Sequence, residues 1–153
     1  VALRAGNAPD QPDNVVQPFL SQRVGLFATQ SYVDKHGMLN GVEDLPNHRF
    51  VGSANADSRA PVNRWRRDHT TPETIMFRCT DGVAMQEAIL ADAGIGFLSL
   101  WVAARHSNLV PMMEPLKEWA GSLWLVTHVE LHRSNKVQSF LKFQKERSKE
   151  WVA

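Results

Sequence analysis

The sequence predicts an α/β fold, because short apolar runs alternate along the chain with segments that have a helical pattern. Residues 24–28 (VGLFA), 74–79 (TIMFRC) and 122–129 (SLWLVTHV) are rich in β-branched and aromatic side chains, which favour strands. A helical pattern follows each of the three runs. Strands that alternate with helices are typical of a largely parallel central sheet, and that is the sheet we expect here.

The helices are predicted from their capping residues. Thr29 has the N-cap position of a short helix that Gly37 ends, and Thr80 or Asp81 caps a second helix that ends before Gly94. The predicted helices cover residues 30–36, 82–93 and 136–149, with a shorter one near 100–105. The additional predicted strands cover residues 95–98 and 109–113.

The remaining segments give weaker patterns. Residues 1–6 (VALRAG) predict a short buried strand that ends in a turn, and residues 48–52 predict a weak strand. Residues 15–20 are ambiguous. Residues 53–71 are polar and have no clean period, so we expect a surface segment with one or two short strands there. Residues 132–135 predict a loop with good capping residues.

Composition narrows the class of protein. With 17 basic and 16 acidic residues, the formal net charge is +1, whereas a domain that binds nucleic acid carries a clear basic excess. The single cysteine, Cys79, excludes an internal disulfide and favours a reducing compartment. The longest uncharged apolar stretch, residues 93–104, is too short for a bilayer, which takes about 20 residues. We therefore expect a cytoplasmic protein without a membrane partner.

Catalytic and metal-binding patterns are missing from the sequence. It contains no nucleophile elbow, P-loop or zinc-protease motif, so we expect no catalytic residues, no metal and no cofactor. Cys79 precedes a helix, where a thiol can be activated, but a small buried thiol is the commoner explanation. His128 and His132 fall across a strand end and a loop, a poor arrangement for a metal pair.

Two strand-to-helix junctions have a physical reason to bind a ligand. Thr29 and Gln30 follow one apolar strand, and Thr80 and Asp81 follow another. Ligands of open α/β sheets bind beyond the carboxyl ends of strands, and helix N-termini there favour anions such as carboxylates. The alternative is plain N-capping, which every helix needs. Asp81 argues against an anion at its own junction.

A third candidate is the pair Gly96 and Phe97, which follows Gly94. Two glycines allow a close backbone approach, and Phe97 offers an apolar wall. A helix-terminating glycine followed by a buried strand explains Gly94 but not Gly96. Trp65 lies among several arginines, for which a solvated loop is the more ordinary explanation than a phosphate or base site.

Five segments, in this order and at compatible spacings, resemble the effector-binding domain of LysR-type transcriptional regulators. They are VALRAG, VGLFATQSYVDKHG, VEDLPNHRFVG, MQEAILADAGIGFLSLWVA and LWLVTHVELHRSNKVQSFLKF. The resemblance covers essentially the whole chain. It implies a two-lobed fold like that of type 2 periplasmic binding proteins, with residues 1–24 and 123–153 in the first lobe and 25–122 in the second.

The resemblance also implies a function. A small molecule, often a small organic acid, binds in the cleft between the lobes, and the change is passed to a winged helix-turn-helix domain. That domain and the start of the first lobe are missing from this sequence, so the first lobe is expected to be incomplete and DNA to be reached only through the missing part. The family also implies a homo-oligomer, dimer or tetramer; the helix over 82–93 is a candidate interface, or simple core packing.

The expected ligand residues are Thr29, Gln30, Thr80, Asp81, Gly96 and Phe97 in the second lobe, with Arg4 in the first. Arg4 is chosen because it follows a strand, and a guanidinium complements a carboxylate. The same fold occurs in the periplasmic solute-binding proteins of transporters, and fold alone does not separate the two functions. An enzyme on this fold would need a nucleophile or an acid–base pair, for which only Cys79, or Asp81 with a histidine that the sequence does not place, is available.

Overall fold

The computed structural model describes residues 1–150, and the chain divides into two compact units. Unit 1 holds Val1–Gln22 and the segment that begins at Gly121, and unit 2 is Arg23–Ala120. Residues 151–153, which the sequence places in the first lobe, lie outside the described residues.

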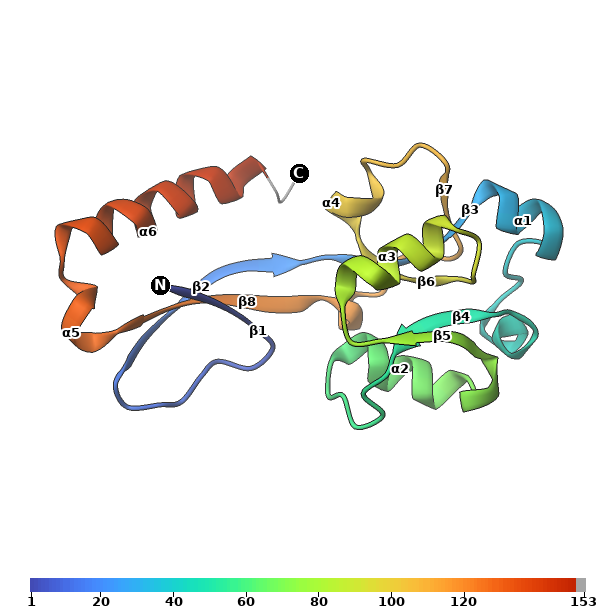
Figure 1. Ribbon diagram of the computed structural model, residues 1–153, viewed down its shortest axis with the longest axis horizontal. Coiled ribbons are helices and arrows are strands. Elements are labelled where there is room, and N and C mark those ends of the chain that lie inside the picture. Colours follow the sequence, from blue (N-terminus) through green and yellow to red (C-terminus); the bar gives the residue numbers. More distant parts are fainter. Residues whose placement is uncertain (151–153) are drawn as a thin grey trace. The chain divides into compact units, whose positions relative to one another are not determined.

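Unit 1 is a three-stranded antiparallel sheet with the order β1-β8-β2, and α6 runs along it (Figure 1). The central strand, β8, pairs with β1 from Ala2 opposite Val126 to Ala5 opposite Leu123. The Nζ of Lys145 in α6 donates a hydrogen bond of 2.7 Å to Oε1 of Gln17 in β2. The elements are β1 (Ala2–Ala5), β2 (Asn14–Gln22), β8 (Gly121–His128), α5 (Val129–His132), α6 (Asn135–Arg147) and η4 (Ser148–Glu150).

Unit 2 contains two sheets and the larger core. Strand β3 lies between β6 and β7 and is antiparallel to both, while β4 and β5 are parallel. A parallel bridge between Phe50 and Ile95 connects the two sheets. The elements are β3 (Val24–Thr29), α1 (Gln30–His36), η1 (Val42–Asn47), β4 (Phe50–Ser53), α2 (Pro61–His69), η2 (Pro72–Thr74), β5 (Ile75–Cys79), α3 (Gly82–Leu90), β6 (Gly96–Ser99), α4 (Leu100–Ala103), β7 (Leu109–Pro111) and η3 (Lys117–Trp119).

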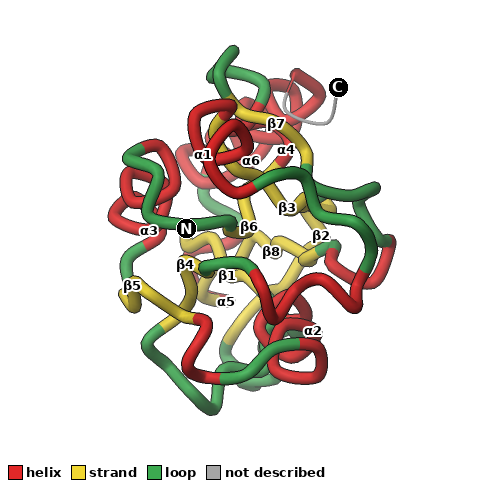
Figure 2. The backbone as a smooth tube through the Cα atoms, turned by 90° about the vertical axis from the view of Figure 1, so that its right-hand side faces the viewer, coloured by secondary structure: helices red, strands yellow, loops and turns green. Residues whose placement is uncertain are grey.

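Helices α2 and α3 lie on opposite sides of the β4–β5 pair, as both views show (Figure 1, Figure 2). On the α2 side the buried cluster includes Phe50, Trp65 and Ile75. On the α3 side it includes Val51 and Ile89. The alternation follows from the strand, because successive side chains point to opposite faces.

The largely parallel sheet that the sequence predicts is therefore wrong in most of its pairings. Among residues 1–150 only β4–β5 and the bridge at Phe50 are parallel, whereas β3 pairs antiparallel with β6 and β7, and β8 pairs antiparallel with β1 and β2. The predicted buried strand at residues 1–6 is a strand, but its Leu3 is exposed. The ambiguous residues 15–20 belong to β2, and the predicted loop at 132–135 is preceded by helix α5.

The predicted surface segment at residues 53–71 contains helix α2 instead. Pro61 starts the helix, where a proline is well tolerated, and Val62, Trp65 and His69 follow at helical spacing. Trp65 is buried, and its ring stacks on His69 at 4.2 Å between centroids. The arginines between these positions interrupt the apolar pattern of α2, so the sequence does not show its apolar face clearly.

Candidate functional site

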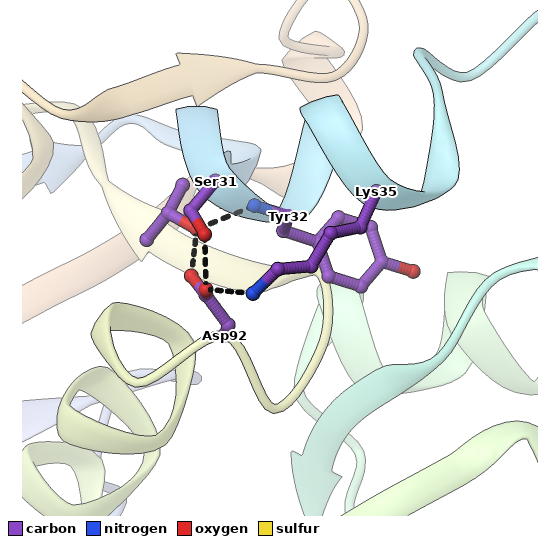
Figure 3. Close-up of polar contacts among 5 residues, drawn as sticks. Ser31, Tyr32, Lys35 and Asp92 are labelled. Atoms are coloured by element: carbon purple, nitrogen blue, oxygen red, sulfur yellow. Dashed lines mark hydrogen bonds and ion pairs between the residues drawn. The ribbon is translucent and has the colours of Figure 1, made fainter.

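Thr29 ends β3 and caps α1, as the sequence predicts. Its side chain is only 2% exposed, and its Oγ1 accepts a hydrogen bond of 3.1 Å from the backbone N–H of Tyr32. The same hydroxyl donates a hydrogen bond to Oδ1 of Asp92 (Figure 3). Both hydrogen-bonding functions of this hydroxyl are therefore used within the chain.

Asp92 lies in the turn between α3 and β6. Its backbone is left-handed, with φ of 62°, and its carboxylate also accepts hydrogen bonds from Ser31 Oγ at 2.5 Å and Lys35 Nζ at 3.1 Å. The hydrogen bonds from Ser31 and Thr29 lower the pKa of Asp92 to about 2, against an ordinary value of 3.8. Asp92, Thr29, Ser31 and Lys35 form what we term the Asp92 corner. The carboxylate of Asp92 therefore already occupies the start of α1, where a ligand anion is expected from the sequence.

The end of α3, the helix before Asp92, differs from the prediction. The sequence assigns that role to Gly94, but α3 stops at Leu90 and the positive φ belongs to Asp92. Gly94 is needed for another reason, because a Cβ there would lie 2.5 Å from the backbone oxygen of Arg49. Aspartate is among the few residues with a side chain that adopt a left-handed backbone readily.

Gln30 is exposed in the first turn of α1. Its Nε2 donates a hydrogen bond of 2.8 Å to Oδ1 of Asp34, one turn further along the helix. Its backbone N–H donates to the carbonyl oxygen of Asn108 at 2.8 Å. The amide side chain thus has a partner inside α1, although it remains accessible.

The second junction lies at the other end of α3. Asp81 caps this helix by accepting a 2.7 Å hydrogen bond from the backbone N–H of Ala84, and its own N–H donates to Cys79 Sγ at 3.3 Å. Thr80 is exposed and makes no hydrogen bond through its hydroxyl within residues 1–150. Nine residues of helix, roughly 13 Å, separate Asp81 from the turn that holds Asp92 and Thr29. The structure does not bring the two junctions together.

Gly96 and Phe97 make packing contacts in the interior of unit 2. Gly96 is buried, and a Cβ there would lie 2.6 Å from Cδ1 of Ile89, so glycine allows α3 to pack closely on β6. The ring of Phe97 lies edge-on to Trp65 and Trp119, with centroids 6.0 and 5.0 Å away. The close packing of α3 on β6 explains why position 96 is a glycine, which the sequence alone does not explain.

Arg4 lies within β1, not after it, and pairs with Trp124 of β8. Its exposed side chain lines an open groove of about 670 Å³ in unit 1, together with His128 and Leu131 among others. Polar and apolar side chains both line the groove. The guanidinium of Arg4 has no hydrogen-bond partner within the described part of the chain.

Arg66, in α2, is one of the arginines around Trp65 for which the sequence favours a solvated loop, and the structure buries it instead. Its side chain is 5% exposed, its Nε is buried, and that Nε has no hydrogen-bond partner among the described residues. Burial lowers the pKa of Arg66, and the positive charges of Arg67 and Arg78 lower it further. The helical spacing of Val62 and Trp65 after Pro61 is the signal that would have placed Arg66 on a buried helix.

Neither a metal site nor a membrane span emerges from the described residues. Across residues 1–150, no three histidine, cysteine or carboxylate side chains lie close enough together to hold a metal ion. No helix in that range has the length and apolar character needed to span a bilayer. His132 Nδ1 lies 2.8 Å from Thr127 Oγ1, which accounts for one of the histidines.

Two α/β units, one of them built from both ends of the chain, define the class of ligand-binding domain with the type 2 periplasmic-binding-protein-like fold. The family model for the LysR substrate binding domain matches residues 1–149. The chain therefore belongs to the LysR substrate-binding domain family. No curated protein matches it.

Solved structures with a similar fold include several regulatory domains. The CrgA regulatory domain of Neisseria meningitidis has a TM-score of 0.76 at 21% identity, over 95% of this chain and 73% of that one. The AmpR effector domain of Pseudomonas aeruginosa has a TM-score of 0.71 at 17% identity, over 95% and 70%. The CcmR regulatory domain of Synechocystis PCC6803, in complex with 2-PG, has a TM-score of 0.68 at 18% identity, over 96% and 73%. The chain spans 51% of full-length CrgA.

Proposed function

We propose that this chain is the effector-binding part of a LysR-type transcriptional regulator, and that its effector is a small organic acid. The family match over residues 1–149 carries the proposal. The similar CcmR domain binds a small molecule, 2-PG, which supports the same role for this fold here. The DNA-binding step belongs to a winged helix-turn-helix domain of the same regulator, which agrees with a net charge of only +1.

Regulation by an effector requires two arrangements of the domain with different affinities for it. A ligand shifts such an equilibrium only by that difference in affinity, whatever its absolute affinity. Of the predicted ligand residues, Thr80 and Arg4 have exposed side chains without partners in residues 1–150. Thr29, Gln30 and Asp81 already have partners, so a ligand would have to share or replace those hydrogen bonds.

Thermal unfolding of the chain with a panel of mono- and dicarboxylates tests the proposal. Each acid is compared with chloride at equal ionic strength, and we expect at least one to raise the Tm in a saturable way. A ligand at 100 times its Kd contributes about 2.7 kcal/mol. Stabilisation by neutral solutes alone would contradict an organic acid as the effector.

Thr80→Val is the cleaner of the two threonine variants for this test. Thr80 is exposed and has no partner, so valine there should leave the fold intact and weaken binding only if Thr80 contacts the acid. Thr29→Val removes the cap of α1 and a partner of Asp92, so it should lower stability with or without a ligand. A Thr80→Val chain that binds the acid as well as the unaltered chain removes Thr80 from the site.

A homo-oligomer is the second part of the proposal, with β5 and α3 as its interface. Helix α3 packs on β5, and the two elements expose Met76, Phe77 and Val83, the last at 67%. Exposed apolar side chains on neighbouring elements are the candidates for such an association surface.

Sedimentation velocity at micromolar concentration measures the association. We expect Val83→Glu to shift the chain toward monomer, and Leu131→Glu, an equally exposed apolar position in unit 1, to leave it unchanged. A chain that is monomeric at every concentration tested would contradict the proposal.

A further inference from the structure

Arg66 lies over β4, at the side of the sheet covered by α2. The nearest atoms to a Cβ built on Gly52 are Arg66 Nε at 3.4 Å, Ile75 Cγ2 at 3.5 Å and Arg66 Cδ at 3.7 Å. A larger residue at position 52 would press on the guanidinium, so the absence of a side chain there provides its space. Gly52 is the last but one residue of β4, which puts Arg66 near the carboxyl end of a parallel strand.

A second and a third guanidinium lie close to Arg66. Arg78 is directly opposite Gly52 in the parallel pair, and residues in register point to the same face. Arg78 Nη2 donates a 2.5 Å hydrogen bond to the Pro72 carbonyl, and Arg67 Nη1 donates to the carbonyls of Ala56 and Ser58 at 3.0 and 2.8 Å. These two arginines are held by the backbone, whereas Arg66 has no such partner.

No negative charge of the described chain compensates Arg66. The two charges that act on it, Arg67 and Arg78, are both positive, and Glu73 acts on Arg78 instead. Nε is sealed from solvent, while Nη1 and Nη2 make no hydrogen bond within residues 1–150 and keep the small exposed area of the side chain. The small part of this guanidinium that a molecule can reach is therefore its fork, Nη1 and Nη2.

A buried guanidinium without partners is costly, and arginine does not escape the cost by losing its proton. A carboxylate or a phosphate offers the two oxygens that the fork of an arginine binds side by side. We propose that Arg66, backed by Gly52 and flanked by Arg67 and Arg78, binds the acidic group of a ligand at the carboxyl end of β4. This inference rests on the proposed function and assigns the effector's charge to a particular residue.

Inorganic phosphate is the probe for this site, added to the 153-residue chain against chloride at equal ionic strength. The nitrogen-15 NMR signal of Arg66 Nε reports binding directly, and the Tm reports its energetic effect. Arg66→Met keeps much of the volume and removes the charge. Arg64→Met, an exposed position in the same helix, removes the same charge and is the matched control.

We expect phosphate to shift the Arg66 Nε signal in a saturable way and to raise the Tm. Arg66→Met should bind phosphate about 10-fold more weakly or worse, because a charge-assisted hydrogen bond is lost, while Arg64→Met should bind it normally. An Arg66 signal that does not move, or an equal response of Arg66→Met and the unaltered chain, would overturn the proposal. If Arg66→Met does not fold, the NMR signal of the unaltered chain still decides.

The same variants separate this inference from the proposed function. An organic acid that stabilises Arg66→Met as well as the unaltered chain leaves an acid-binding domain in place and overturns the role of Arg66. Phosphate binding at Arg66, together with no effect of any acid in the panel, supports the anion site and contradicts the organic-acid effector.

Discussion

Unit 2 holds two charged side chains, Asp92 and Arg66, whose surroundings are opposite. Asp92 accepts hydrogen bonds from Thr29, Ser31 and Lys35, and its charge is compensated on the spot. Arg66 is more deeply buried, yet its guanidinium has no hydrogen-bond partner within residues 1–150 and has two positive neighbours. The Asp92 corner stabilises the fold, because it joins the start of α1 to the turn after α3.

This difference between Asp92 and Arg66 indicates which of the two charges is available to a ligand. Before the structure is known, the start of α1 is the natural place for an acid, since helix N-termini favour anions. In the folded chain Asp92 fills that place. The uncompensated charge lies instead at Arg66 in helix α2, beside the β4–β5 sheet.

Removal of the Asp92 side chain should have the largest effect. Asp92→Ala loses the bonds to Ser31 and Lys35, leaves the buried Thr29 hydroxyl without an acceptor and keeps a left-handed backbone that alanine adopts poorly. We expect the free energy of unfolding to fall by about 2 kcal/mol, measured by urea denaturation. Asp92→Asn should lose less, and an equal loss in both variants would argue against a role for the hydrogen bonds.

Removal of the Arg66 charge should act in the opposite direction. Arg66→Met exchanges an unpaired buried cation for an apolar side chain, so the unliganded chain should gain about 1 kcal/mol. Arg64→Met, at an exposed position, should stay within about 0.5 kcal/mol of the unaltered chain. A clear loss of stability in Arg66→Met alone would mean that Arg66 has a stabilising partner after all.

The stability that Asp92 contributes should also depend on pH. The pKa of Asp92 is lowered in the fold, to about 2 from 3.8, so its contribution is complete above pH 3.8 and is lost as the pH falls toward 2. Asp92→Asn has no such group and should lose less stability across this window. Urea midpoints measured from pH 5 to pH 2 compare the two, and parallel profiles would contradict the assignment.

The ion pair between Lys35 and Asp92 should contribute least. Its length is 3.1 Å, but the Lys35 side chain is 62% exposed, so water and salt screen it. We expect Lys35→Ala to cost less than about 0.5 kcal/mol, measured by urea denaturation at low and high salt. A larger loss, unaffected by salt, would mean that Lys35 stabilises the Asp92 corner more than the hydroxyls of Thr29 and Ser31 do.

Local signals predicted much of unit 2 correctly. Thr29, Gly37 and Asp81 cap their helices as expected, because capping depends on residues three or four apart in the chain. The family resemblance, which rests on the order of several segments, is confirmed by the match over residues 1–149.

Contacts between distant segments could not be predicted in this way. The bond between Thr29 and Asp92 spans 63 residues, and nothing near Thr29 indicates it. The role of Gly96 depends on Ile89 in a helix that packs over it, and strand direction depends on how whole elements are connected. Helix α2 was missed for a different reason, since the arginines on its surface hide a spacing that is present in the sequence.

The discontinuous course of unit 1 has a consequence for biosynthesis. Strands β1 and β2 both pair with β8 and not with each other, yet residues 23–120 are translated between them and β8. Ribosomes add about 5–20 residues per second, so β1 and β2 wait for their partner β8 for about 5–20 s while unit 2 emerges. Translation speed across residues 23–120 therefore sets how long those strands are open to chaperones or to aggregation, and slow codons there should lower the yield of folded protein.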